Sequence, residues 1–597
     1  MRLLVFCLLV VTNFSDNGKA SIDSVLPASA NVLLEDTTRS IDNSCYRPCK
    51  LNVKPRKCEY KFRIQPTVND DGKTIISIND MVPGPSINVC MNDIIVVEVE
   101  NRIPDQDIAL HWHGVEQKGT PFMDGVPMVT QCPIGFGSKY KYAFRASKPG
   151  TFFYHADSVQ HQSDGIFGAL IVNQPAPFEP HVDLYHYDRS EEHTLIISAD
   201  FPETLTGNLE NLSEIKPTAL NINGDTDIAK IFVMENFAYR LRLINAIAAE
   251  CPVVYSIDAH HVTAIATDGN PVKPVTAEHI LLYPGERMDI VVRASQPAGG
   301  YWARARGYGG ACAGLNARAM LLYSGFNYTA MLVDDEKNDY SFEMDPSSAI
   351  HGQGLESLNE ETDYGAETIK SVYLGVDRTN DLKDEPNDFR YISDAMPKKP
   401  FFPAPIALRT DGVVQINGKS FLYPNAPLLL YPKEVRAETI CAVGEEDERR
   451  DPQCVQVLNA ERNDVIELAL VNEGFGSNDT YTFHMHGSSV QIVATWQNPA
   501  RTPLSKADFL KFTNENNVVS KSANPPLKDT IVVPNKGFTI IRMRLSQPGA
   551  WMLECRSCSL YSLPTAVVVN VPQTLPKSVL DSLPKCGNYR PPDVLLH

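Results

Sequence analysis

The stretch His111-Trp112-His113-Gly114 places two histidines on alternate residues. Alternate side chains of a β-strand point to the same side of the sheet, so both imidazoles could reach one metal cluster. An isolated His-x-His pair is more often two structural histidines that are satisfied by hydrogen bonds. What the pair means therefore depends on the rest of the chain.

Three later segments accompany this pair, and one of them repeats its His-x-His spacing. They are His155-Ala156-Asp157 followed by Asp164-Gly165-Ile166-Phe167-Gly168, then Phe483-His484-Met485-His486-Gly487, and finally Trp551-Met552-Leu553-Glu554-Cys555-Arg556. Each segment alone is a weak signal, but four such segments in this order form a specific pattern.

Length and composition indicate a globular protein of several domains. The 597 residues are 43% hydrophobic and 21% charged, and a length of roughly 150 residues per domain favours three units. Short β-rich runs are separated by turn signals. The runs include Ile94–Val99, Ala169–Val172, Thr194–Ser198 and Asp289–Val292. This pattern predicts an all-β protein of β-sandwiches.

The beginning of the chain predicts export. Residues 1–20 carry a short apolar stretch, typical of a signal peptide and too short to span a bilayer. Twelve cysteines remain after Cys7, an even number that favours disulfides. Asn211, Asn327 and Asn478 begin glycosylation sequons. The formal charge of −18 disfavours nucleic acid or an anionic membrane as a partner. We expect a secreted glycoprotein without a membrane span, whose extracellular partner is unknown.

The four histidine and cysteine segments resemble those of the multicopper oxidases, and the resemblance is strongest to insect laccases. The supporting motifs are Cys45-x3-Cys49-x8-Cys58, Met81-Val82-Pro83-Gly84-Pro85-Ser86-Ile87, Gly119-Thr120-Pro121 through Gln131-Cys132-Pro133, Tyr239-Arg240-Leu241-Arg242 and Gly285-Glu286-Arg287. The resemblance implies three cupredoxin-like (plastocyanin-like) Greek-key β-sandwiches, with copper in the first and last. We place the domains at 59–176, 177–333 and 400–572. Around them lie the signal peptide, a cysteine-bearing segment at 21–58, an acidic linker at 334–399 and a tail at 573–597.

The family pattern of ten histidines and one cysteine is only partly present. Six ligand positions survive, namely His111, His113, His155, His484, His486 and Cys555. Five carry other residues, namely Asp157, Tyr481, Glu554, Arg556 and Leu560. By this resemblance the chain is most similar to multicopper oxidase-related proteins with degenerate copper ligands.

The resemblance implies a different degree of loss for each copper. The blue (type 1) copper would have Tyr481, Cys555 and Leu560, of which only the former type 1 thiolate is a ligand. The type 2 copper keeps His111 and His484. The type 3 positions would be His113 and His155 with Arg556, which has no lone pair to donate, and His486 with two carboxylates, Asp157 and Glu554.

Two explanations of these substitutions remain open. In the first, Arg556 replaces the metal charge and pairs with Asp157 or Glu554, which would give a metal-free ionic cluster. Alternatively, a mononuclear type 2-like copper site persists. The preferred function is a secreted pseudoenzyme with a scaffold or binding role. The alternatives are a metal-binding protein or oxidoreductase with partial copper, and an active laccase or ferroxidase.

The remaining cysteines and histidines have structural interpretations. We expect Cys555 and Cys558 to form a local disulfide or to be two buried thiols, and Cys441 to close a loop with Cys454. Laccases of this type suggest that Cys90 pairs with Cys586. His161, His260 and His261 match no ligand position and are expected to be structural or exposed.

Overall fold

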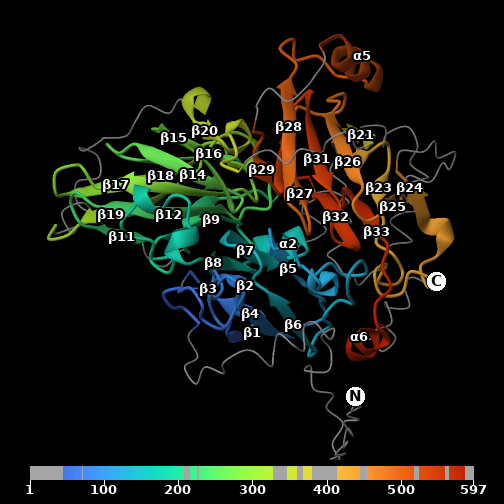
Figure 1. Ribbon diagram of the computed structural model, residues 1–597, viewed down its shortest axis with the longest axis horizontal. Helices are drawn as coiled ribbons and strands as arrows, with labels where there is room; N and C mark the ends of the chain where they lie inside the picture. Colours follow the sequence, from blue (N-terminus) through green and yellow to red (C-terminus); the bar gives the residue numbers. More distant parts are fainter. Residues whose placement is uncertain are drawn as a thin grey trace, which may run out of the picture.

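The computed structural model describes residues 45–69, 71–207, 215–224, 228–326, 346–359, 368–379, 413–443, 453–516, 524–558, 564–584 and 586. The expected signal peptide, Asn211, Asn327 and Leu560 lie outside these residues. Within them, three β-sandwiches meet around a common centre (Figure 1). Within the described residues, no helix is both long and apolar enough to cross a membrane.

The first domain is a sandwich of two four-stranded sheets. One has the order β2 (Thr74–Ile78), β1 (Lys57–Val68), β4 (Ile94–Asn101), β6 (Lys139–Arg145). The other has the order β3 (Ile87–Cys90), β8 (Phe167–Asn173), β7 (Gly150–Ala156), β5 (Leu110–His113). The expected strand at Ile94–Val99 is β4, in which buried and half-buried residues alternate after a fully buried start. The short helix α2 (Val159–Ser163) follows β7.

The second domain packs two six-stranded sheets. The first runs β10 (Ala219–Ile222), β9 (Thr194–Asp200), β12 (Ala238–Asn245), β17 (Arg287–Arg293), β14 (Val262–Thr267), β15 (Asn270–Ala277). The second runs β11 (Lys230–Val233), β19 (Asn316–Tyr323), β18 (Gly300–Gly307), β13 (Val253–Ile257), β16 (Ile280–Leu282), β20 (Ile350–His351).

The third domain has the same two-sheet plan. One sheet runs β22 (Val413–Ile416), β21 (Ile369–Thr379), β26 (Val465–Asn472), β31 (Gly537–Arg544), β28 (Val490–Gln497), β29 (Leu527–Lys528). The other runs β23 (Ser420–Phe421), β25 (Gln453–Asn459), β33 (Ala566–Val571), β32 (Gly549–Cys555), β27 (Tyr481–Met485), β30 (Thr530–Val533), with β24 (Ile440–Ala442) beside β25. Two helices, α5 (Lys506–Asn516) and α6 (Lys577–Ser582), lie outside the sheets.

The segment predicted as a linker, 334–399, is partly strand. Ile350–His351 forms β20 and pairs with β16 of the second domain. Ile369–Thr379 forms β21, which pairs along its length with β26 of the third domain. The linker prediction is wrong for these residues, because the acidic character of the segment concealed the alternating apolar side chains Val372, Leu374 and Val376.

Buried charges join the second domain to the third. The guanidinium of Arg287 donates to both carboxylate oxygens of Asp529, at 2.6 and 2.5 Å. Beside it, the ammonium of Lys528 lies 2.9 Å from a carboxylate oxygen of Asp268 and of Glu286. All five side chains are at most 2% exposed. Removing one partner would leave a buried charge unmatched, so this network fixes β30 against the second domain.

All twelve cysteines after Cys7 form disulfides, and one predicted pair is wrong. The expected pair Cys441–Cys454 is present, and of the two alternatives for Cys555 and Cys558 the disulfide is the one observed. Cys586 pairs with Cys132 and not with Cys90, because Cys90 at the end of β3 lies beside the N-terminal segment and bonds Cys49. The tail is thus joined to the first domain, but at another position. The other two pairs are Cys45–Cys58 and Cys251–Cys312.

Peptide mapping under non-reducing conditions tests this connectivity. We expect a peptide that links Cys132 to Cys586 and another that links Cys49 to Cys90. Replacing Cys132 and Cys586 together by serine should lower the free energy of unfolding by about 2–4 kcal/mol, since it releases a long closed loop. A Cys90–Cys586 peptide would contradict the fold described here.

Candidate metal centre between the first and third domains

Five buried histidines meet where the first domain contacts the third. They are His111 and His113 on β5, His155 on β7, His484 on β27 and His486 directly after β27, and each is at most 1% exposed. The pairing of β5 with β7 sets His111 opposite His155. The pairing of β27 with β32 sets His484 opposite Glu554. The register of β5, β7 and β27 thus aims the five imidazoles into one space.

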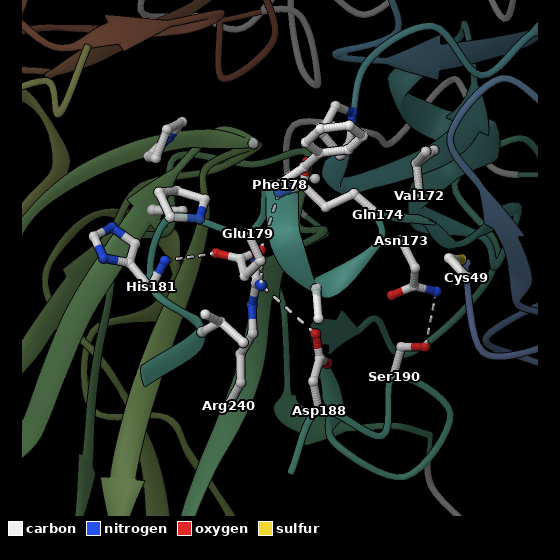
Figure 2. A pocket seen from close by; sticks show the side chains of 18 of the residues that line it. Cys49, Val172, Asn173, Gln174, Phe178, Glu179, His181, Asp188, Ser190 and Arg240 are labelled. Atoms are coloured by element: carbon white, nitrogen blue, oxygen red, sulfur yellow. Dashed lines mark hydrogen bonds and ion pairs between the residues drawn. The ribbon is translucent and has the colours of Figure 1, made fainter. Parts of the chain in front are cut away.

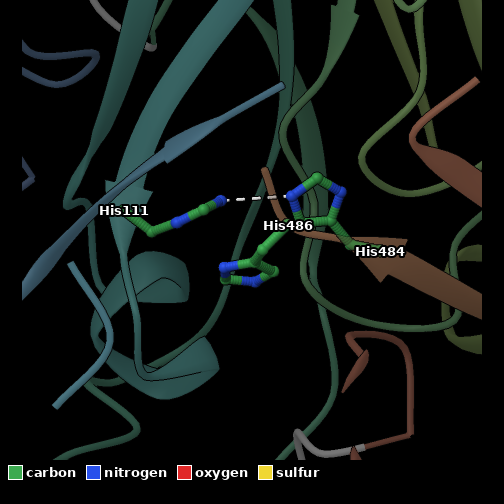
Figure 3. Close-up of side chains that lie close together, drawn as sticks. All are labelled: His111, His484 and His486. Carbon is green, nitrogen blue, oxygen red and sulfur yellow. Dashed lines mark hydrogen bonds between the residues drawn. The ribbon is translucent and has the colours of Figure 1, made fainter. Parts of the chain in front are cut away.

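His111 and His484 face each other with their Nε2 atoms 3.1 Å apart (Figure 3). The Nδ1 of His111 lies 2.8 Å from the carbonyl oxygen of Asp124, and the Nδ1 of His484 lies 3.0 Å from that of Asp529. A carbonyl oxygen only accepts, so both Nδ1 atoms carry the proton. Burial lowers the pKa of both histidines, which keeps them neutral. Two Nε2 lone pairs therefore point at one another.

His113 and His155 form a hydrogen-bonded chain in which every partner is a protein group. The Nδ1 of His155 donates to the carbonyl oxygen of Ala156 at 2.7 Å, which leaves its Nε2 as an acceptor. The Nδ1 of His113 donates to that Nε2 at 3.2 Å. The Nε2 of His113 then accepts from the hydroxyl of Thr530 at 3.0 Å. Every ring nitrogen of this pair has a protein partner.

His486 lies between two carboxylates. Its Nδ1 is 2.8 Å from the Oδ2 of Asp124, and its Nε2 is 3.4 Å from the Oε1 of Glu554. Burial alone would lower the pKa of His486, but the two carboxylates outweigh it and raise the pKa to about 9. An imidazolium donates from both nitrogens, so His486 offers no lone pair in this state.

Arg556 enters the same space from the end of β32. Its guanidinium donates to the carboxylate of Glu554 at 3.0 Å and to the backbone carbonyl of Asp157 at 2.6 Å. It also contacts the Nδ1 of His155 at 3.3 Å and the side-chain oxygen of Gln162 on α2. Arg556 thus ties the third domain to the first, and it is only 4% exposed.

The two carboxylates beside Arg556 differ in charge. Burial would raise the pKa of Glu554, but Arg556 and His486 outweigh burial and hold it below its usual range. Burial, together with the charge of Glu554, raises the pKa of Asp157 to about 8. The Oδ2 of Asp157 also has no hydrogen-bond partner within the described residues. Arg556 therefore forms its ion pair with Glu554 and binds Asp157 through the main chain.

Tyr481 and Cys555 both belong to the hydrophobic core of the third domain. The sulfur of Cys555 is bonded to that of Cys558. The hydroxyl of Tyr481 lies 2.8 Å from that of Ser477, and burial raises the pKa of Tyr481 well above its usual value. Both side chains are at most 2% exposed.

The chain matches models of one family over all three domains. Models described as multicopper oxidase match residues 63–177, 183–326 and 422–572. The chain belongs to the multicopper oxidase family. Among its relatives, Laccase-2 of Botryotinia fuckeliana is 28% identical over 82% of this chain and 77% of that protein. Laccase-6 of Arabidopsis thaliana is 25% identical over 88% and 94%, respectively.

Solved multicopper oxidases share the fold. The structure of Fet3p, a multicopper oxidase that functions in iron import, superposes with a TM-score of 0.67 at 18% identity, covering 89% of this chain and 94% of that one. The laccase from Botrytis aclada gives 0.66 at 23% identity, covering 89% and 91%. The predicted fold class of three cupredoxin-like domains is thereby confirmed.

The sequence did not single out several residues that hold the cluster in place. Asp124, Asp529 and Thr530 contact the histidines, and Gln162 contacts Arg556. Asp124 lies within the quoted motif from Gly119 to Pro133, and this position was the only signal for it in the sequence. The histidines outside the family pattern are structural or exposed. His161 and His260 are buried and hydrogen-bonded, and His261 is exposed beside Glu278.

A separate cleft of about 690 Å³ lies between the first two domains (Figure 2). Arg240 lies at its floor and pairs with Glu179 at 2.8 Å and with Asp188 at 3.5 Å. Asn173 hydrogen-bonds Ser190 nearby. None of the five clustered histidines lines this cleft.

Replacing Arg556 tests its role as the matching charge. Arg556→Met should lower the free energy of unfolding by about 3–5 kcal/mol, because Glu554 stays buried without its main cation. Arg542→Met is the matched control, since Arg542 pairs with Glu467 at 2.7 Å in a more exposed setting and should cost less than about 1 kcal/mol. Denaturant unfolding measures both. Equal losses in the two variants would contradict the assignment.

Proposed function

We propose that this chain is a multicopper oxidase-related protein that has lost laccase and ferroxidase activity and acts as a scaffold or binding protein. The observation that carries the proposal is the disulfide between Cys555 and Cys558. A blue copper site needs a cysteine thiolate and two imidazoles. Here the sulfur is oxidised, and Tyr481 stands at one imidazole position by the family resemblance. The residues present do not fit a type 1 copper.

The histidine cluster supports the same proposal. Of the positions assigned to the type 3 coppers, Arg556 supplies a cation without a lone pair, and His486 is held as an imidazolium by Asp124 and Glu554. His113 and His155 satisfy each other by hydrogen bonds. These residues do not fit a copper pair, and they form a coherent ionic cluster without one.

We also propose that this protein is secreted. The apolar leader at residues 1–20, the twelve paired cysteines and the exposed Asn478 are consistent with a secreted glycoprotein. The quoted cysteine spacing in the N-terminal segment favours an insect origin. In this interpretation the family fold is retained for its surfaces, and the partner is an extracellular molecule.

Oxygen uptake by purified, copper-loaded protein tests the loss of activity. With a diphenol or with ferrous iron as reductant, we expect no consumption above that of the copper-free protein, while a fungal laccase under the same conditions turns over. Cys558→Ser, which opens the disulfide, should also remain inactive because Tyr481 is unchanged. Copper-dependent turnover by the wild-type protein would establish an active laccase or ferroxidase instead.

A second candidate function is binding of a single metal ion. The opposed lone pairs of His111 and His484, 3.1 Å apart, favour it, because two neutral acceptors repel unless a cation or a shared proton lies between them. His486 is close to both rings, but its charge makes it a poor third ligand. The donor set therefore fits one weakly held ion that keeps other ligands of its own, similar to a type 2 copper.

Metal titration separates the two candidates. If a metal is bound, the wild-type protein should take up about one equivalent of Cu²⁺, and His111→Ala with His484→Ala should abolish uptake. His260→Asn, which alters a buried histidine outside the cluster, should leave uptake unchanged. Absence of specific uptake by the wild-type protein would eliminate metal binding and leave the ionic cluster.

A further inference from the structure

The cleft between the first two domains has the size and the position of a ligand site. Its volume of about 690 Å³ lies within the range of roughly 300–1,000 Å³ that is usual for such sites, which occur preferentially where domains meet. Residues 148–150 and 172–174 of the first domain line it, and so do 269–271 of the second. The segment 178–182, which connects the two domains, forms part of its rim. We call this space the interdomain cleft.

The guanidinium groups that line the interdomain cleft are already paired with carboxylates, as Figure 2 shows for the one at the floor. The pairs are Arg240 with Glu179, Arg242 with Asp188 and Arg47 with Asp93, at 2.8, 2.6 and 2.7 Å. None of the three guanidiniums is more than 14% exposed. Buried pairs of this kind hold the floor in one arrangement, and a charged ligand would have to displace an existing partner.

Lys148 is the remaining lysine or arginine of the lining, and it supplies a hydrogen-bond donor. Its ammonium donates to the hydroxyl of Ser489 at 2.8 Å, which uses one of its three N–H groups. Burial lowers the pKa of Lys148, and the carboxylates of Glu116 and Asp529 oppose this shift. Its charge is thus offset by neighbours within the protein.

Three polar side chains of the lining have unused hydrogen-bonding capacity. The Oγ of Ser190 accepts from Asn173 at 3.4 Å, and its own proton has no acceptor in the described part of the chain. The Oδ1 of Asn270 and the Oε1 of Gln174 likewise accept no hydrogen bond from any described residue. Ser190 and Asn270 are only 2% and 4% exposed. The lining therefore offers both donors and acceptors, and a hydroxyl group can satisfy either kind.

The rim of the interdomain cleft is apolar. The ring of Phe178 is 57% exposed, and Pro180 and Val182 near it in the chain are also exposed (Figure 2). A pyranose ring carries hydroxyls around its edge and C–H groups on its face. That face packs on an aromatic ring, because the negative π cloud attracts C–H groups. The rim thus suits a molecule that is polar at its edge and apolar on one face.

We propose that the interdomain cleft binds a neutral oligosaccharide. The paired guanidiniums leave no place for a charged group, the unused donors and acceptors suit hydroxyls, and the rim suits a sugar ring. The net charge of −18 would also repel a sulfated or carboxylated chain. A purely apolar ligand would remove water from the polar lining without replacing its hydrogen bonds. The proposal does not depend on oxidase activity, because none of the five clustered histidines lines this cleft.

Calorimetric titration of the full-length protein with three neutral hexasaccharides tests the proposal. The probes are cellohexaose, maltohexaose and the hexamer of N-acetylglucosamine. We expect saturable binding of at least one, and Phe178→Ala should bind it about tenfold more weakly because the stacking surface is lost. Phe136→Ala is the matched control, since this ring of the first domain is 59% exposed and lies outside the lining. It should retain the wild-type affinity.

A second measurement uses the unaltered protein, so that misfolding of a variant cannot obscure the answer. The bound hexasaccharide should slow amide hydrogen exchange in peptides that cover 173–182 and 269–271, and should leave the peptide around Phe136 unchanged. The proposal is overturned if none of the three probes binds, if both variants lose affinity equally, if exchange at the cleft is not slowed, or if the carboxylated hexamer of galacturonic acid binds more tightly than the neutral sugars.

Discussion

The buried guanidinium of Arg556 is the interaction on which the centre of this molecule depends. It projects from the end of β32 in the third domain and contacts His155, the Asp157 carbonyl and Gln162 of the first domain. A buried cation must be matched, and Glu554 two residues earlier on the same strand supplies the matching charge. Glu554 in turn contacts the imidazolium of His486, which is balanced by Asp124. Cation and carboxylate alternate along this line, so a change in any member disturbs its neighbours.

The histidines of this cluster form two pairs that differ in whether their ring nitrogens have hydrogen-bond partners of matching role. His113 and His155 have hydrogen-bond partners at every ring nitrogen, whereas His111 and His484 direct lone pairs at each other. The difference arises from the backbone carbonyls that fix the tautomers of the second pair, and Asp529 supplies one of them while its carboxylate is held by Arg287. The bridge between the second and third domains thus also orients a histidine in the centre. The proposed loss of the family's electron transfer is therefore compatible with the opposed pair of His111 and His484.

The sequence predicted the fold and the histidines of the cluster. It predicted less well which contacts the residues of the cluster make with one another. His-x-His spacing and strand periodicity place the five histidines, because both depend only on which face of a strand a residue occupies. Charge alone predicts that Arg556 pairs with Asp157 or Glu554. It does not reveal that the ion pair is with Glu554 or that the contact with Asp157 runs through its carbonyl. The pairing of Cys586 with Cys132 and the strands within 334–399 were missed. The first depends on how the tail packs, and the second on apolar alternation within an acidic segment.

We propose that the third domain lacks the electron entry site of the family. The visible and electron paramagnetic resonance spectra of purified protein loaded with Cu²⁺ test this most directly. We expect no intense visible band from a copper–thiolate bond, and either no bound copper or a single type 2-like signal. A blue band with the narrow hyperfine splitting of a type 1 site would show instead that Cys555 binds copper as a thiolate and that the electron entry site is present.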